Sequence, residues 1–156
     1  MSLEEVVSNL AKEIKKIEGK TMKGLIRVAI PVLRDATEGA PIVTGNLRAS
    51  KYVVTSRGKV EQGRNPEFKG KQAAKMARAH SRTLSDRRSV VGQATKSTVE
   101  IGFSAEYALK VHENPRAGKT GMLGASEVGH WKFLEWALRD NQKRILSIIR
   151  EEARIK

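Results

Sequence analysis

The segment Glu113 to Gly121, with the sequence ENPRAGKTG, contains residue types that can hold a phosphate group. A nucleotide-binding phosphate loop needs a glycine, four residues and then Gly-Lys-Ser/Thr, because its backbone N–H groups wrap around the phosphates. Gly118, Lys119 and Thr120 fit the second half of that pattern, but Glu113 stands where the first glycine is needed. The preceding EYALKVHE is also a poor core strand. We therefore predict a basic loop here and no nucleotide site.

Other residue types that perform catalysis or bind metals are present, but they do not form a set. The chain has no cysteine, which excludes disulfides, thiol nucleophiles and cysteine-ligated zinc. The carboxylates Glu106 and Glu113 lie around one short segment without a nucleophile between them. No histidine has a metal-ligand spacing to another histidine or a carboxylate; the three are His80, His112 and His130. The serines lack the strand–serine–helix setting of a nucleophile elbow; those considered are Ser50, Ser104 and Ser126. We predict no enzyme, no metal site and no cofactor.

Composition bounds the class of protein. The chain has 156 residues, which suits a single domain spanning 1–156, and 39% of them are hydrophobic. The N-terminal MSLEEVVSNL is acidic and amphipathic rather than a signal peptide, and no apolar run approaches the roughly 20 residues that span a bilayer. We expect no membrane contact. The net charge of +13 favours a polyanionic partner, either nucleic acid or an acidic protein surface.

The positive charge is concentrated in the segment 57–96. This segment holds eleven basic residues against three acidic ones, a net charge of +8, and few large apolar side chains. We predict that it is a basic arm or extended loop projecting from a core formed by 1–56 and 97–156, since it cannot bury much surface. The candidate contact residues are Arg57, Lys59, Arg64, Lys69, Lys71, Lys75, Arg78, Arg82, Arg87 and Arg88.

Three interpretations of the basic arm remain open. It could become ordered on an acidic neighbouring subunit. It could contact DNA phosphates without reading bases, although it lacks the interleaved aromatic residues of a single-strand platform. It could also be a solvated loop. Trp131 and Trp136 could stack on bases, but their place on an amphipathic segment favours packing in the core or at an interface.

Hydrophobic periodicity predicts long helices at both ends of the chain. The first should run from about residue 3 to about residue 38, either as one bent helix or as two in series, because Pro31 should kink or break it. Ser2 is a candidate N-cap. A long amphipathic helix is expected from about 130 to about 153. The apolar positions of the first helix begin with Leu3, Val6, Val7, Leu10, Ile14 and Ile17, and those of the last include Phe133, Leu134, Ala137, Leu138 and Ile145.

Two strands and short helical segments are expected between these helices. The segments 50–57 and 97–104 are rich in β-formers and should pair, with the basic arm as a long excursion of their hairpin. Within the arm, a helix exposed on all sides or ordered only by a partner is expected. Thr44 should cap a short turn that carries Leu47 inward, and 105–113 should form a short helix with Tyr107, Ala108 and Val111 inward. The expected fold class is α+β.

Three blocks resemble one family of proteins. APIVTGNLRAS, VEIGFSAEYALKVHEN and GHWKFLEWAL occur in the order and spacing of a signature found in small neck proteins of long-tailed bacteriophages. These are described as tail-completion, head–tail joining or minor tail/capsid proteins. The resemblance covers about 1–56 and 97–156, so the long basic arm is its main departure. It implies structural roles for Pro41, Thr44, Gly45, Leu47, Arg48, Tyr107, Ala108, His112, Glu113, Phe133 and Leu134, with Tyr107 and Phe133 in the core.

The resemblance also implies a function without catalysis. It implies long terminal helices packed on a small antiparallel sheet, and a homo-oligomeric ring of six or twelve copies at the head–tail junction of a virion made in a bacterial cytoplasm. Its partners would be neighbouring neck, connector and tail proteins, with nonspecific contact to packaged DNA as a further possibility. The alternative hypothesis is a basic DNA-binding accessory protein, which the net charge alone would favour.

Overall fold

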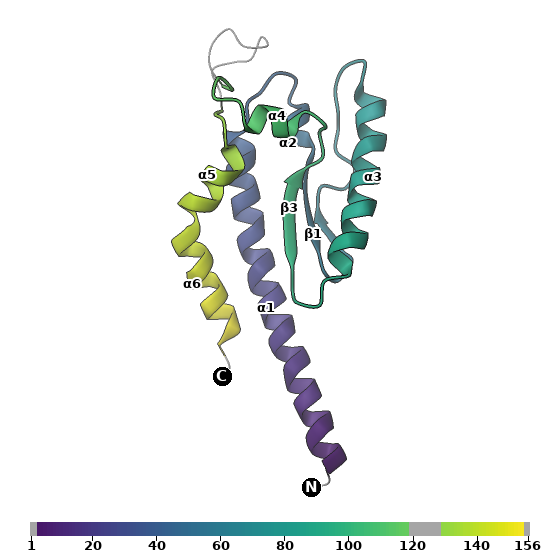
Figure 1. Cartoon of the computed structure of the whole chain (residues 1–156), viewed down its shortest axis with the longest axis vertical. Coiled ribbons are helices and arrows are strands. Elements are labelled where there is room, and N and C mark those ends of the chain that lie inside the picture. Colours follow the sequence, from purple (N-terminus) through teal and green to yellow (C-terminus); the bar gives the residue numbers. More distant parts are fainter. Residues whose placement is uncertain (1–2, 119–128, 155–156) are drawn as a thin grey trace.

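The computed structural model describes residues 3–118 and 129–154. Their elements stack side by side: α5 and α6, then α1, then the sheet, then α3 (Figure 1). The predicted α+β fold, with long terminal helices and a small antiparallel sheet, is confirmed. The elements in chain order are α1 (Leu3–Gly39), α2 (Asn46–Ala49), β1 (Lys51–Thr55), β2 (Val60–Gln62), α3 (Ala73–Gly92), β3 (Val99–Phe103), α4 (Ala108–His112), α5 (Phe133–Asp140) and α6 (Gln142–Ala153).

The first helix is continuous through Pro31, so the alternative of two helices in series is wrong. Proline removes one intrahelical hydrogen bond, but α1 is held on both sides of this point by α5, α6 and the sheet, which compensates for the loss. The helix ends at Gly39, and Pro41 prevents its continuation. The candidate cap Ser2 lies outside the described residues.

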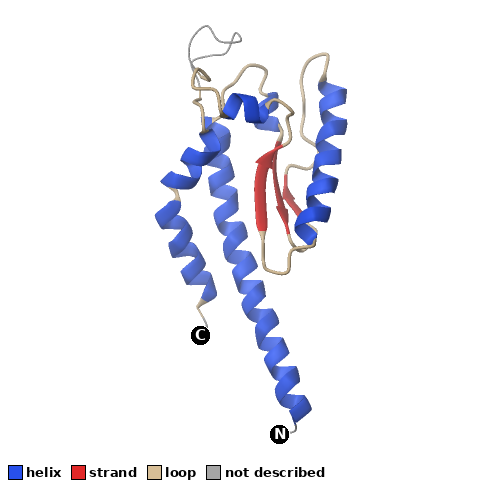
Figure 2. Ribbon diagram, in the orientation of Figure 1, coloured by secondary structure: helices blue, strands red, loops and turns tan. Residues whose placement is uncertain are grey.

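The sheet is covered on both faces. It has the order β2–β1–β3 and both pairs are antiparallel, with Val53 opposite Ile101. Because side chains alternate along a strand, Val53 packs against Ala29 and Leu33 of α1, whereas Tyr52 and Val54 pack against α3. Figure 2 shows this small sheet between helices. The two predicted strands are therefore confirmed as β1 and β3, and β2 is an addition that the sequence did not indicate.

The expectation of a projecting arm at 57–96 is wrong. Strand β2 pairs with β1, and α3 packs on the sheet through His80, Leu84 and Val91, which are all buried. Arg87 of α3 also forms an ion pair with Glu100 of β3 at 2.5 Å. The segment folds back because three inward positions, spaced 4 and 7 residues apart, suffice to give an otherwise polar helix one buried face.

The predicted C-terminal helix is interrupted. The helices α5 and α6 meet at Asn141, which is buried and donates hydrogen bonds to Asp35 Oδ2 at 2.8 Å and to the carbonyl of Ala137 at 2.9 Å. The first of these bonds helps to hold the pKa of the Asp35 carboxyl below its usual value. Ala137 is buried as expected, but Leu138 points outward and is exposed. The side chains of Ile145, Ile148 and Ile149 pack on α1.

Candidate functional site

Three segments that are distant in sequence meet at one end of the molecule. They are the turn 40–47, the segment 104–118 with α4, and 129–134 at the start of α5 (Figure 1). Ala40, Leu47, Ala105 and Phe133 form their common buried cluster. Each of the three blocks that carry the family resemblance contributes to it. We call this region the assembled end.

Phe133 is the centre of the assembled end. It is 2% exposed, and its ring makes edge contacts with Phe103 at 5.3 Å and with His112 at 5.0 Å between centroids. Nδ1 of His112 lies 2.7 Å from Oε1 of the adjacent Glu113. Leu134 and Ala108 are half-buried beside the same cluster. The prediction that Phe133 is a core residue is confirmed.

Backbone hydrogen bonds join the three segments. The N–H of His130 donates to the carbonyl of Gly39 at 2.9 Å, and the N–H of Lys132 donates to the carbonyl of His112 at 2.7 Å. Thr44 accepts a hydrogen bond from the N–H of Asn46 at 3.3 Å, just before α2. These bonds fix how the end of α1 meets α4 and α5.

Arg48 supplies a cation to the C-terminal end of α1. Its Nε donates to the carbonyl of Ala40 at 2.9 Å and its Nη2 to the carbonyl of Glu38 at 2.6 Å. The last turn of α1 has no basic residue of its own, so this guanidinium from the next helix satisfies the negative end of the helix dipole. Partial burial lowers the pKa of Arg48, which stays charged.

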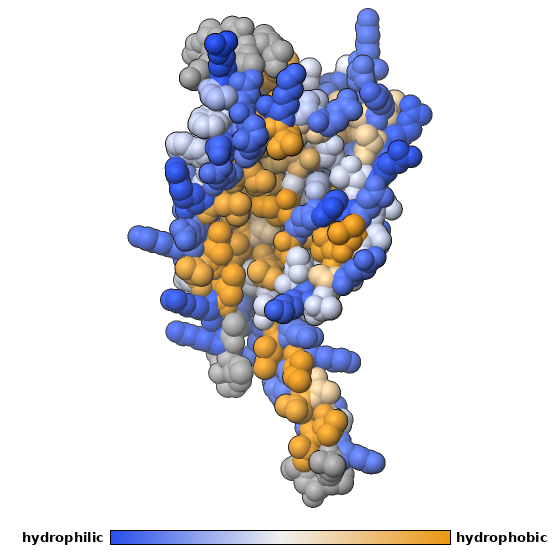
Figure 3. Space-filling model, in the orientation of Figure 1, coloured by the Kyte–Doolittle hydropathy of each residue, from blue (hydrophilic) through white to orange (hydrophobic). Residues whose placement is uncertain are grey.

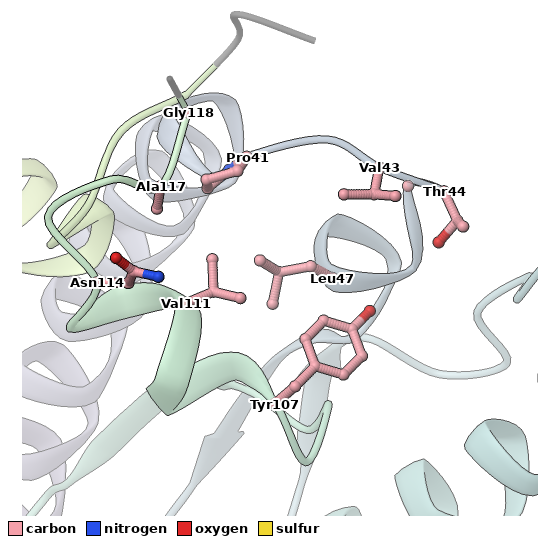
Figure 4. Close-up of a pocket in the computed structure, with 10 residues that line it drawn as sticks. Pro41, Val43, Thr44, Leu47, Tyr107, Val111, Asn114, Ala117 and Gly118 are labelled. Carbon is pink, nitrogen blue, oxygen red and sulfur yellow. The ribbon is translucent and has the colours of Figure 1, made fainter. Parts of the chain in front are cut away.

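A small apolar cavity opens beside this cluster. It encloses about 90 Å³, and Leu47, Tyr107 and Val111 point into it (Figure 4). Pro41, Val43 and Ala117 complete most of its apolar wall. Tyr107 is 36% exposed at the rim, so its predicted place in the core is wrong. The ring follows β3 on a turn that leads into α4, which leaves one edge open to solvent.

The structure describes residues 113–118 of the segment that partly matches a phosphate loop. Glu113 follows a helix, α4, rather than a buried strand, and Gly118 has a positive φ of 80°. The predicted short helix at 105–113 is thereby confirmed over Ala108–His112. Lys119 and Thr120 lie outside the described residues, as does the candidate nucleophile Ser126.

A scan against protein-family models and searches of curated proteins and of solved structures found no match to this chain. A proposal about its function therefore has to be based on the sequence and the geometry of the chain itself. Within 3–118 and 129–154, histidines, aspartates and glutamates do not gather in groups of three or more that could hold a metal ion. In the same ranges no helix is long and apolar enough to cross a membrane.

A second candidate surface lies at the opposite end, along the start of α1. Side chains at Val7, Leu10, Ile14 and Ile17 follow heptad spacing, and Val6 lies beside them; all five are between 39% and 60% exposed. We call these five residues the α1 seam. Figure 1 shows this part of α1 projecting beyond the other elements, and Figure 3 shows apolar side chains along it.

The basic residues predicted as contacts are the third candidate. Some of them are bonded within the fold, and most are exposed. Two are held within the fold: Arg87 bonds to Glu100, and Arg88 Nε donates to the carbonyl of Gly58 at 2.9 Å. Lys75 makes a long, exposed ion pair with Glu106 at 3.7 Å. All of the predicted contact residues except Arg87 are exposed; those on or near β2 and its loops are Arg57, Lys59, Arg64 and Lys69, and those on or next to α3 are Lys71, Lys75, Arg78, Arg82 and Arg88.

Sequence reasoning missed the pairing of His80 with Ser104. His80 is 1% exposed, its Nδ1 lies 2.6 Å from Ser104 Oγ, and its Nε2 lies 2.5 Å from the carbonyl oxygen of Gly63. His80 thereby ties α3 to the end of β3 and to the loop after β2. The single available signal was a histidine in line with Leu84 and Val91 on one helix face.

Proposed function

We propose that this chain is a structural subunit of the neck of a long-tailed bacteriophage, and that it assembles into a ring joining the DNA-filled head to the tail. The ring would hold six or twelve copies and contact neighbouring connector and tail proteins. The proposal combines the resemblance carried by three sequence blocks with the surfaces that the fold leaves uncovered.

The packing of the assembled end supports the resemblance. Pro41, Leu47, Ala108 and Phe133 belong to three separate blocks, and they lie around one cluster and one cavity. The three blocks therefore share one structural centre of the fold, as blocks of one signature would. The roles implied for Gly45 and Arg48 agree with this: Gly45 has a φ of 84° at the start of α2, where a side chain would be strained, and Arg48 caps α1.

The observation that carries the proposal is the uncovered α1 seam. The heptad positions continue from Ile17 through Thr21 and Gly24 to Val28, and there they are covered: Gly24 lies against Ile149, and Val28 packs with α6. Lys20 marks the limit of this cover, since its Nζ donates to the carbonyl of Arg154 at 3.3 Å. Toward the N-terminus the same helix face continues without a partner among the described residues.

A second copy of the chain is the occupant that fits the seam best. The covered part of the same face is an antiparallel helix pair, so the uncovered part is shaped for another helix. Covering the exposed half of five apolar side chains contributes about 1 kcal/mol each. A projecting helical segment of this length is marginally stable in water without such contacts.

Two groups of exposed apolar residues lie at opposite ends of the molecule, which favours a ring over a symmetric dimer. The α1 seam lies at one end of the molecule, while Val43, Tyr107 and Leu109 are exposed around the opposite, assembled end. Two unlike surfaces at opposite ends make a head-to-tail contact, and such contacts close into rings when the rotation between copies permits.

Two experiments test the proposal. Light scattering after size-exclusion chromatography should give a mass of six or twelve chains, with rings in negative-stain electron microscopy. Deleting the gene from the phage that encodes it should leave DNA-filled heads and separate tails. Infectious particles of normal appearance would contradict the neck role, and a monomer at all concentrations would contradict the ring.

A further inference from the structure

The outward face of α3 is strongly basic. Lys75, Arg78 and Arg82 follow one another at intervals of three and four residues, so they form a single row along the helix. Ser85 and Ser89 extend the same row toward the end of α3. The opposite face of the helix, with His80 and Leu84, is fixed on the sheet. This rigid attachment means that the row is presented in one orientation.

The cations of the row are free to take an external partner. Arg78 and Arg82 have no carboxylate partner among the described residues, and the ion pair of Lys75 with Glu106 leaves both side chains more than 60% exposed. Asp86 is the one acid on the exposed positions of α3. Figure 3 shows hydrophilic side chains along the edge of the molecule that α3 forms.

The small residues around the row indicate what kind of partner can approach. The exposed positions of α3 between Ala74 and Ser89 are otherwise alanines, serines and Arg88. The exposed Val90 near the end of the helix lies roughly a quarter turn away from the row. Protein interfaces are typically centred on aromatic and apolar residues, which this face lacks. Small side chains let the phosphate backbone of a nucleic acid come close. The side chains of serine, lysine and arginine commonly contact phosphate oxygens.

We propose that the outward row of α3, which we call the α3 row, binds the phosphate backbone of double-stranded DNA without reading its sequence. Successive cations lie about one helical turn, or roughly 5 Å, apart along the axis. This spacing suits consecutive phosphates of one strand, which follow one another by about 3.4 Å along the duplex axis and farther along the strand itself. The inference stands independently of ring assembly, because it concerns a different face of the molecule.

The test is binding of a fluorescent 30-base-pair duplex of arbitrary sequence, followed by anisotropy between about 50 and 200 mM salt. The test variant carries Lys75→Gln, Arg78→Gln and Arg82→Gln. Its matched control carries Lys12→Gln, Lys15→Gln and Lys16→Gln, which removes the same charge from exposed positions of α1. Circular dichroism and chromatography establish that both variants fold and assemble as the parent does.

The α3 variant should bind about tenfold or more weakly near 100 mM salt, and the slope of log affinity against log salt should fall by about 2 to 3, because each lost phosphate contact removes about one unit. The control should change affinity less than about twofold, since charges beyond a Debye length of about 10 Å are screened. Equal losses in both variants would overturn the proposal, because net charge alone would then explain binding. Displacement of the duplex by poly-glutamate at equal charge would also overturn it, because the row would then accept any acidic chain.

Discussion

His80 on α3 and Ser104 after β3 form a hydrogen bond of 2.6 Å between Nδ1 and Oγ. The carbonyl of Gly63 can only accept, so Nε2 of His80 carries a proton and donates it there. Nδ1 and the Ser104 hydroxyl share the other hydrogen bond. The imidazole of His80 thereby joins α3, the end of β3 and the loop after β2, and adds to the contacts that make the segment 57–96 part of the fold.

Replacing the side chain of His80 should destabilise the protein strongly. His80→Ala removes a fully buried side chain and leaves the Ser104 hydroxyl and the Gly63 carbonyl unpaired, so we expect a loss of about 3 kcal/mol in the free energy of unfolding. Ser104→Ala should cost about 1 to 2 kcal/mol, because only one bond is lost. Urea denaturation measures both. Ser81→Ala, at the next and exposed position of α3, is the control and should change stability by less than about 0.5 kcal/mol. Similar values for His80→Ala and the control would show that the bonded ring contributes little.

The ion pair between Arg87 and Glu100 should appear in the pH dependence of stability. Hydrogen bonding from Arg87 holds the pKa of Glu100 below its ordinary value, with a further contribution from the hydroxyl of Tyr52 at 3.0 Å. A lowered folded-state pKa stabilises the protein above the unfolded pKa, and this contribution is lost as the pH falls through the folded pKa.

Glu100→Gln should therefore cost about 1 kcal/mol at pH 7 and flatten the loss of stability between about pH 5 and 3. Arg87→Gln should reduce the same acid-side dependence, since it removes the main cause of the shift. Melting temperatures at a series of pH values measure both effects. Parallel curves for the parent and both variants would show that this pair is not coupled to folding.

Much of the fold could be predicted because its signals are local. The periodicity of α1 and the β-formers of β1 and β3 were sufficient, and so was the turn that Pro41 and Gly45 impose. The packing of α3 was missed because its charges mask a narrow buried face. One signal was available in β1: Tyr52, Val53 and Val54 are consecutive apolar residues, which require cover on both faces of the sheet.

The other differences are tertiary effects that periodicity does not report. The break at Asn141 depends on Asp35, which lies 106 residues earlier in the chain, and the continuity of α1 through Pro31 depends on the helices packed around it. The assembled end could be anticipated from three sequence blocks, but the exposure of Tyr107 could not, because it follows from where the cavity opens. The seam residues were recognised as apolar, whereas their lack of cover required the fold.

Arg48 should contribute more to the free energy of unfolding than its partial exposure indicates. Arg48→Met keeps much of the aliphatic contact but removes the bonds to the carbonyls of Glu38 and Ala40, and we expect a loss of about 2 kcal/mol. Arg48→Lys should recover only part, because a single ammonium cannot reproduce the two-pronged geometry of a guanidinium. Arg34→Met is the matched control, since Arg34 pairs with Asp35 at the surface. Chemical denaturation measures the free energy of unfolding of each variant. An equal loss in Arg34→Met and Arg48→Met would refute the capping role.

The α1 seam should be required for the subunits to assemble but not for each subunit to fold. Leu10→Glu places a charge in the middle of the seam at a side chain that is 60% exposed, so it should leave the melting temperature of the isolated subunit nearly unchanged. In an assembled ring the same carboxylate would be buried against a second copy, where an unpaired charge is strongly unfavourable. We therefore expect light scattering to show a monomer, or an association at least about a hundredfold weaker than that of the parent. Ser8→Glu is the matched control, because it introduces the same charge two residues away on the other side of the helix. Loss of assembly in both variants would point to charge repulsion rather than the seam, and full assembly of Leu10→Glu would mean that the subunits meet through another surface.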